Sequence, residues 1–230
     1  MIIIKNYGTD ITEKSPYKPL VYTRSMVLFE SIAALSGIIA TVWISLGVFV
    51  AAKFYPNYSH SNQFCSELGA SGSPTEKLSP FINNYPLSFI FCLFGWYITQ
   101  LPDSNLALTI TGWLVIFHGV GTLIAGYFPM DNDPYTEEPS FNCNVHSTAG
   151  FVMLLTLIIA PILLAFSPES QIIPFEFRVF SVLTVILSIY YVVKLAKAFK
   201  AKEKAGLYQR ISYWIQLTWL STFSLLLVQV

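Results

Sequence analysis

Four polar side chains of this 230-residue chain are of the types that carry out acyl transfer or bind anions. Ser66 would be the nucleophile and His146 its general base. Asp131 would orient the imidazole, and Arg210 would hold a negative charge. The same four groups could instead form a structural hydrogen-bond network, or bind a polar headgroup or an ion. Residue types alone leave these alternatives open.

His118 is a separate candidate because it lies within a long hydrophobic run. An ionisable group inside a bilayer is costly, so His118 is either hydrogen-bonded in the protein core or part of a binding site. We expect it to face other helices and to hydrogen-bond with one of them. It lies ten residues before Phe128, about 15 Å below the interface at which His146 is expected, so the two imidazoles cannot share one haem iron or zinc ion. We assign no metal, and the sequence leaves the cofactor unknown.

The composition shows what must position these groups. Hydrophobic residues make up 54% of the chain and charged residues 11%, whereas a soluble domain has about 25% charged residues. The net charge is 0. This balance excludes a soluble enzyme, a disordered chain and a basic nucleic-acid-binding protein. The sequence therefore predicts an all-α, polytopic membrane protein.

Hydrophobic runs long enough to cross a bilayer occur six times. We expect a polar tail over 1–25 and a single six-helix transmembrane domain over 26–230. The predicted helices are 26–52, 84–101, 106–128, 146–166, 175–198 and 211–229.

An even number of spans places both termini on one side of the membrane and the three most polar loops together on the other. These loops are 53–83, 129–145 and 199–210. Ser59 and Glu67 lie in the first of them, and we expect both to contribute to binding. Because Pro129 ends the third helix, Asp131 should emerge beside the start of the fourth. We predict that Asp131 contacts at least one residue of the set His146, Ser66, Ser59 and Arg210.

The charges leave the orientation open. Eight lysines and arginines lie on the polar-loop side and five on the other, which favours a cytoplasmic polar-loop face. The four positive charges that precede the first helix favour the reverse. Cys65 and Cys143 could form a disulfide only if their face is not cytoplasmic.

Three stretches of sequence together resemble a known family of prokaryotic membrane proteins, domain of unknown function 998. The first runs from YPNYSHS at 55–61 to SELGASG at 66–72, the second covers 119–131 and is followed by His146, and the third is GLYQR at 206–210. The resemblance implies an integral protein of a prokaryotic cytoplasmic membrane and no established activity. By position it points to Ser59, Ser66, Gly69, Phe128, Pro129, Asp131, His146 and Arg210.

A more distant likeness is to alkaline ceramidases and adiponectin-type receptors, which have Ser, Asp and three His near one membrane face. This chain has three histidines but lacks their His-xxx-His pair and their seventh span. We interpret the chain as a multi-pass membrane protein whose polar-loop face binds a lipid headgroup, an ion or a partner. The alternative is an interfacial hydrolase with a lipid-like substrate. The expected partner is membrane lipid, and no nucleic acid is expected.

Overall fold

The computed structural model describes residues 24–102, 105–168, 170 and 172–229. This part of the chain contains six long helices and no strand, which confirms the predicted fold class. The expected tail at 1–25 lies almost entirely outside the described residues. A 3-10 helix, η1, covers Cys65–Gly69, and a π-helix, η2, covers Pro80–Asn84. The long helices are α1 Arg24–Lys53, α2 Tyr85–Thr99, α3 Leu106–Tyr127, α4 Phe141–Ala165, α5 Phe175–Ala201 and α6 Ala205–Val228.

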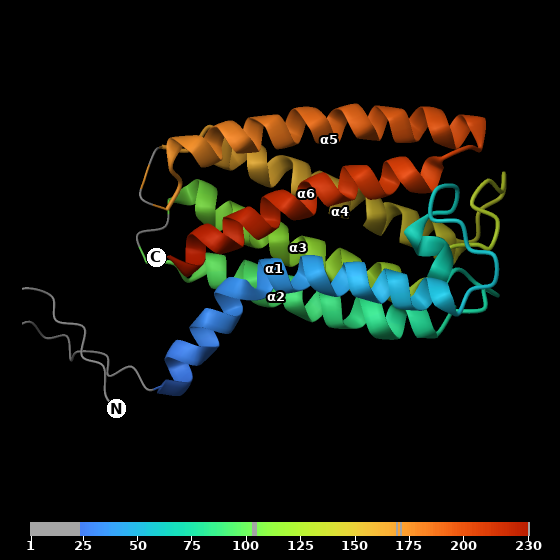
Figure 1. Ribbon diagram of the computed structural model, residues 1–230, viewed down its shortest axis with the longest axis horizontal. Coiled ribbons are helices and arrows are strands. Elements are labelled where there is room, and N and C mark those ends of the chain that lie inside the picture. Colours follow the sequence, from blue (N-terminus) through green and yellow to red (C-terminus); the bar gives the residue numbers. More distant parts are fainter. Residues whose placement is uncertain (1–23, 103–104, 169, 171, 230) are drawn as a thin grey trace, which may run out of the picture.

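The helices form a closed ring in chain order. Each packs against the next, and α6 returns to pack against α1. The start of α1 and the end of α6 lie at one end of the bundle, and the long loops gather at the other (Figure 1). The structure therefore confirms that the three polar loops share one face.

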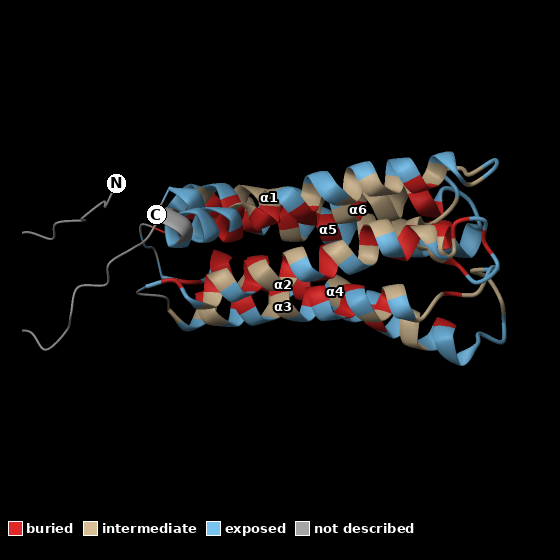
Figure 2. Cartoon of the chain, turned by 90° about the horizontal axis from the view of Figure 1, so that it is seen from below, coloured by how far each residue is buried: buried red, intermediate tan, exposed pale blue. Residues whose placement is uncertain are grey.

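Five of the helices are long and apolar enough to span a membrane. The remaining long helix, α2, has 15 residues, but η2 leads directly into it and lengthens the helical segment by five residues. Exposed positions cover the outside of the bundle, and buried positions face inward (Figure 2). Many exposed side chains are large and apolar, which suits lipid rather than water. Examples are Phe89, Leu106, Phe117, Phe151 and Ile186. The chain is a multi-pass membrane protein.

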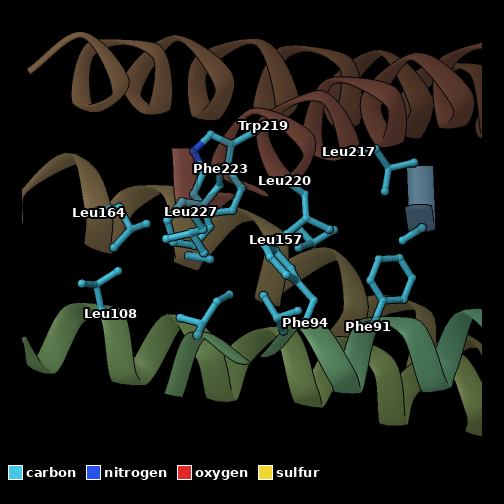
Figure 3. Packing of buried hydrophobic residues seen from close by; sticks show 14 of the residues in the cluster. Phe91, Phe94, Leu108, Leu157, Leu164, Leu217, Trp219, Leu220, Phe223 and Leu227 are labelled. Carbon is cyan, nitrogen blue, oxygen red and sulfur yellow. The ribbon is translucent and has the colours of Figure 1, made fainter. Parts of the chain in front are cut away.

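Bulky side chains fill the centre of the ring in the half opposite the long loops (Figure 3). Phe177 of α5 stacks on Trp219 of α6 with ring centroids 5.8 Å apart, and Trp219 stacks on Phe223 at 5.7 Å. Phe91 and Phe94 of α2 are also fully buried in this cluster. This end of the ring is therefore a solid core.

Two helices begin at least five residues earlier than the sequence predicted. The fourth begins at Phe141 instead of 146, because Ser140 caps it by accepting the Cys143 N–H through Oγ at 3.1 Å. The sixth begins at Ala205 instead of 211, so the expected loop 199–210 is only a short turn. Lysines marked that loop in the sequence. Lys202 and Lys204 do form the turn, with φ of 53° and 59°, but the six residues that follow are helical and carry one charge, Arg210.

The start of α2 is shaped by Pro86, which lacks the N–H that would bond to the carbonyl of Ile82. The Trp43 indole donates to this carbonyl instead, at 2.8 Å. In the π-helix just before α2, Asn83 lies against the backbone of Gly47. A Cβ at Gly47 would be 1.8 Å from Asn83 Oδ1, so the glycine makes room for the amide.

Candidate functional site

The loop half of the ring is hollow. A cavity of about 650 Å³ lies there, which is within the size range of small-molecule sites, about 300–1,000 Å³. Residues from all six helices line it, together with parts of the first and third loops. The ring therefore has a packed half and a hollow half, and the hollow half lies under the polar loops.

One face of α6 lines the cavity with polar side chains. Gln209, Ser212, Tyr213 and Gln216 follow the spacing i, i+3, i+4 and i+7, which places them along one side of a helix. Asn83 from the π-helix also lines the cavity. The interior of a largely apolar bundle thus carries a polar stripe.

Three of these side chains hold a buried polar atom with no partner in the protein. They are Asn83 Oδ1, Ser212 Oγ and Gln216 Nε2, on side chains that are only 5%, 3% and 1% exposed. Leaving a buried polar group without a hydrogen bond costs about 1–3 kcal/mol. Asn83, Ser212 and Gln216 all line the cavity, so after a small side-chain rotation the contents of the cavity can supply the missing partners. Water can fill that role in the free protein, and a ligand can replace it.

His118 lies at the inner end of the cavity and is fully buried, as predicted. Its Nδ1 lies 3.1 Å from the Met153 carbonyl and 3.2 Å from Thr156 Oγ1, and its Nε2 lies 3.1 Å from the Tyr213 hydroxyl. A carbonyl only accepts, so we assign the proton to Nδ1, and Tyr213 then donates to Nε2. The imidazole links α3 to α4 and α6, and the Tyr213 oxygen keeps its capacity to accept.

Arg210 holds the first loop against the start of α6. Its Nη1 donates to the carbonyls of His60, Gln63 and Gly206, with 2.8 Å to Gln63 and 3.0 Å to Gly206. Its Nη2 donates to the Tyr58 hydroxyl at 2.6 Å, and burial raises the pKa of that phenol. Arg210 was expected to hold an anion, but here its guanidinium mainly fixes a loop. Segments 55–61 and 206–210, which carried part of the family resemblance, form the two sides of this contact.

His146 holds the end of α3. Pro129 has no N–H to bond to the carbonyl of Ala125, four residues earlier. His146 Nδ1 lies 2.9 Å from that carbonyl and 2.9 Å from the carbonyl of Phe128, so it must carry the proton. The imidazole therefore replaces the missing backbone donor.

The predicted contacts of Asp131 are wrong. Its Oδ2 accepts the backbone N–H of Ser140 at 2.8 Å, and hydrogen bonds from the Ser140 side chain and backbone hold the pKa of Asp131 below its usual value. The described residues show no hydrogen bond or ion pair from Asp131 to His146, Ser66, Ser59 or Arg210. The reason is the early start of α4. Ser140 offers its N–H directly to Asp131, whereas His146 lies further along the helix and bonds to α3.

Ser59 and Glu67 serve the local structure of the first loop. Ser59 Oγ accepts the N–H of Asn62 at 3.3 Å, which closes a turn. Glu67 is buried and accepts from the Phe64 N–H at 2.7 Å and from Gln63 Nε2 at 3.0 Å, so it caps η1. Neither residue lines the cavity.

Four of the seven predicted site residues line the cavity, and three do not. Those lining it are Ser66, His118, His146 and Arg210. Within the described ranges, no three His, Cys, Asp or Glu side chains are grouped so that they could hold a metal ion. Cys65 and Cys143 are free thiols at the cavity wall, and burial raises the pKa of the Cys65 thiol.

The sequence reasoning missed the unpartnered polar groups. The polar residues of α6 recur at helical spacing in the sequence, but the predicted helix begins at 211, so it does not include Gln209, the first residue of the stripe. Asn83 fell just outside the predicted second helix. No pattern in the sequence marked the π-helix that carries it.

The family model for proteins of unknown function called DUF998 matches residues 38–226. No curated protein and no solved structure shows a significant match. The family match covers the cavity, most of the ring and the three stretches of sequence that carried the resemblance. The chain therefore belongs to the DUF998 family of proteins of unknown function.

Proposed function

We propose that this protein binds a small amphipathic molecule of the membrane in the cavity under its polar loops. The observation that carries the proposal is the set of three buried polar atoms without partners, on Asn83, Ser212 and Gln216, in a cavity of about 650 Å³. A ligand that bonds to these atoms would remove their cost. The ligand's apolar part would lie against the hydrophobic residues of the same cavity.

The arrangement of α4 and α5 supports entry from the bilayer. These helices pack against each other, and they diverge toward the end with the loops (Figure 1). Leu154 of α4 and Val192 and Leu195 of α5 line the cavity. An apolar chain could therefore enter sideways between the two helices while its polar end meets α6.

The alternative, an interfacial hydrolase, has less support. Ser66 and His146 line the cavity, but Asp131 bonds to Ser140 and does not orient the imidazole. A cation site also has little support, because no carboxylate lines the cavity. The family resemblance favours a prokaryotic cytoplasmic membrane as the location.

A photoactivatable long-chain alcohol that carries a diazirine tests the proposal. The protein is placed in lipid nanodiscs, irradiated with the probe and digested, and the labelled residues are located by mass spectrometry. We expect labels on cavity residues such as Met153, Leu154 and Leu195. Labels confined to the outer, lipid-facing surface would contradict the proposal.

Gly150 offers a variant that blocks the cavity. It is an exposed residue at the cavity wall, and a Cβ added there meets no atom within 4 Å, so a side chain can start there without a clash. Gly150→Trp should abolish labelling inside the cavity. Leu155→Trp, on the exposed surface of the same helix, should leave it unchanged. Equal labelling in both variants would show that the probe does not enter the cavity.

A further inference from the structure

We infer that the polar end of the ligand is uncharged and carries hydroxyl or amide groups, and that it enters the cavity first. This inference rests on the proposed function and specifies the class of ligand. It follows from which polar atoms are left without partners, how deep they lie and which charges surround them.

The unpartnered atoms require both a donor and an acceptor. Asn83 and Gln216 are primary amides, which present an N–H donor and a carbonyl acceptor side by side. Ser212 offers a hydroxyl that can do either. The natural complement of such a set is a hydroxyl or an amide, because each also donates and accepts. A group that only accepts, such as a carboxylate, would leave the acceptor atom of Asn83 without a partner.

The charges point the same way. No Asp or Glu lines the cavity, so a cationic head would have no counter-charge there. No Lys lines it either. Arg210 is the one permanently charged side chain at the wall, and both of its Nη atoms already donate to the first loop and to Gly206. Only its Nε is buried without a partner. An anionic head held by this Nε is therefore the rival to an uncharged one.

The depth of the polar side chains in the cavity favours an uncharged head over an anionic one. Arg210 lies in the second turn of α6, beside the loops, whereas Gln216 lies eleven residues beyond the helix start, about 16 Å along the axis. His118, near that depth, bonds to neutral partners only. A charge brought to this level would lose its hydration without gaining an opposite charge. An uncharged head loses much less.

The test compares heads on one hydrocarbon chain. Monoolein, oleamide, oleic acid and oleylamine compete with the photoactivatable alcohol for the cavity of the intact protein in nanodiscs at pH 8. We expect monoolein, a diol, and oleamide to displace the label at concentrations about tenfold lower than oleic acid and oleylamine. A difference between the diol and the amide would identify which uncharged head fits better. Equal potency for all four, or a preference for the acid or the amine, would overturn the inference.

Variants test the residues themselves. Ser212→Ala should weaken competition by monoolein about tenfold, because it removes one partner of the head. Ser188→Ala is the matched control, since Ser188 on α5 is also buried and without a partner but does not line the cavity. The control should behave as the unchanged protein. An equal effect of both substitutions would overturn the assignment of Ser212.

The same data separate the two proposals. A cavity that is not labelled in any condition contradicts the proposed function and the inference together. A labelled cavity that shows no preference for uncharged heads contradicts the inference alone. The panel uses the unaltered protein, so this result does not depend on whether a variant folds.

Discussion

The hydroxyl of Tyr213 should be one of the groups that hold the hollow half of the bundle together. It lies 3.1 Å from His118 Nε2, and the two rings are stacked with centroids 6.0 Å apart. Tyr213→Phe keeps the ring and removes only the hydroxyl. The substitution leaves the Nε2 of a fully buried imidazole without its donor.

The expected loss of stability can be bounded. A buried acceptor left without a partner costs about 1–3 kcal/mol. Side-chain hydrogen bonds between membrane helices have measured values of about 0.6 kcal/mol on average and about 1.7 at most. Because Tyr213 lines the cavity, water can take the place of the removed hydroxyl beside Nε2, and we expect the lower part of the first range, about 1–1.5 kcal/mol. The equilibrium constant for unfolding should then rise about fivefold to twelvefold.

Reversible unfolding in mixed micelles, titrated with dodecyl sulfate, measures this change. Tyr127→Phe is the control, because Tyr127 is 72% exposed at the same end of the bundle. The double variant with His118→Leu should show a coupling of at least about 0.5 kcal/mol between the two sites. Equal stability of Tyr213→Phe and the unchanged protein, with no coupling, would refute the assigned hydrogen bond.

Three further predictions concern the loops and the proline sites. Arg210→Lys should release the first loop, because a single ammonium cannot replace the four hydrogen bonds of the guanidinium. Limited proteolysis between 54 and 64 should become faster, and unchanged cleavage would contradict the role of Arg210 in holding the loop. Trp43→Phe should cost about 1 kcal/mol by leaving the Ile82 carbonyl unpaired, and Pro86→Ala in that background should restore part of the loss by supplying an N–H. The pKa of Asp131 is lower in the folded protein than its ordinary value of 3.8, so the stability that Asp131 contributes is complete above pH 3.8 and is lost as the pH falls through the folded pKa. Asp131→Asn should remove this dependence of stability on acid, and an unchanged profile of stability against pH would contradict the prediction.

The helix count and the shared loop face could be predicted from the sequence because they depend on strong signals. Long apolar runs must span the bilayer, and an even number of spans fixes which loops lie together. The position of His118 inside the bundle followed from the cost of a polar ring in lipid. These features need no knowledge of any particular contact.

The site itself depended on details that the sequence pattern does not carry. A shift of six residues in the start of α6 turned a presumed loop into the first turns of a helix, including Arg210. The choice of partner for Asp131 depended on where α4 begins, and Ser140 rather than His146 decided that. Pro86 and Pro129 each lack the N–H that would bond to a carbonyl four residues earlier, and the side chains of Trp43 and His146 donate to those carbonyls instead. Such pairings become visible only when the backbone is in place.

The central claim is that the cavity binds an amphipathic molecule through its unpartnered polar groups. An experimental structure of the protein in nanodiscs with monoolein tests it most directly. The account predicts density for the glycerol head within hydrogen-bond distance of Gln216, Ser212 and Asn83, with the acyl chain leaving between α4 and α5. A cavity that has closed, with Asn83 and Gln216 bonded to each other and the monoolein confined to the outer surface, would contradict it.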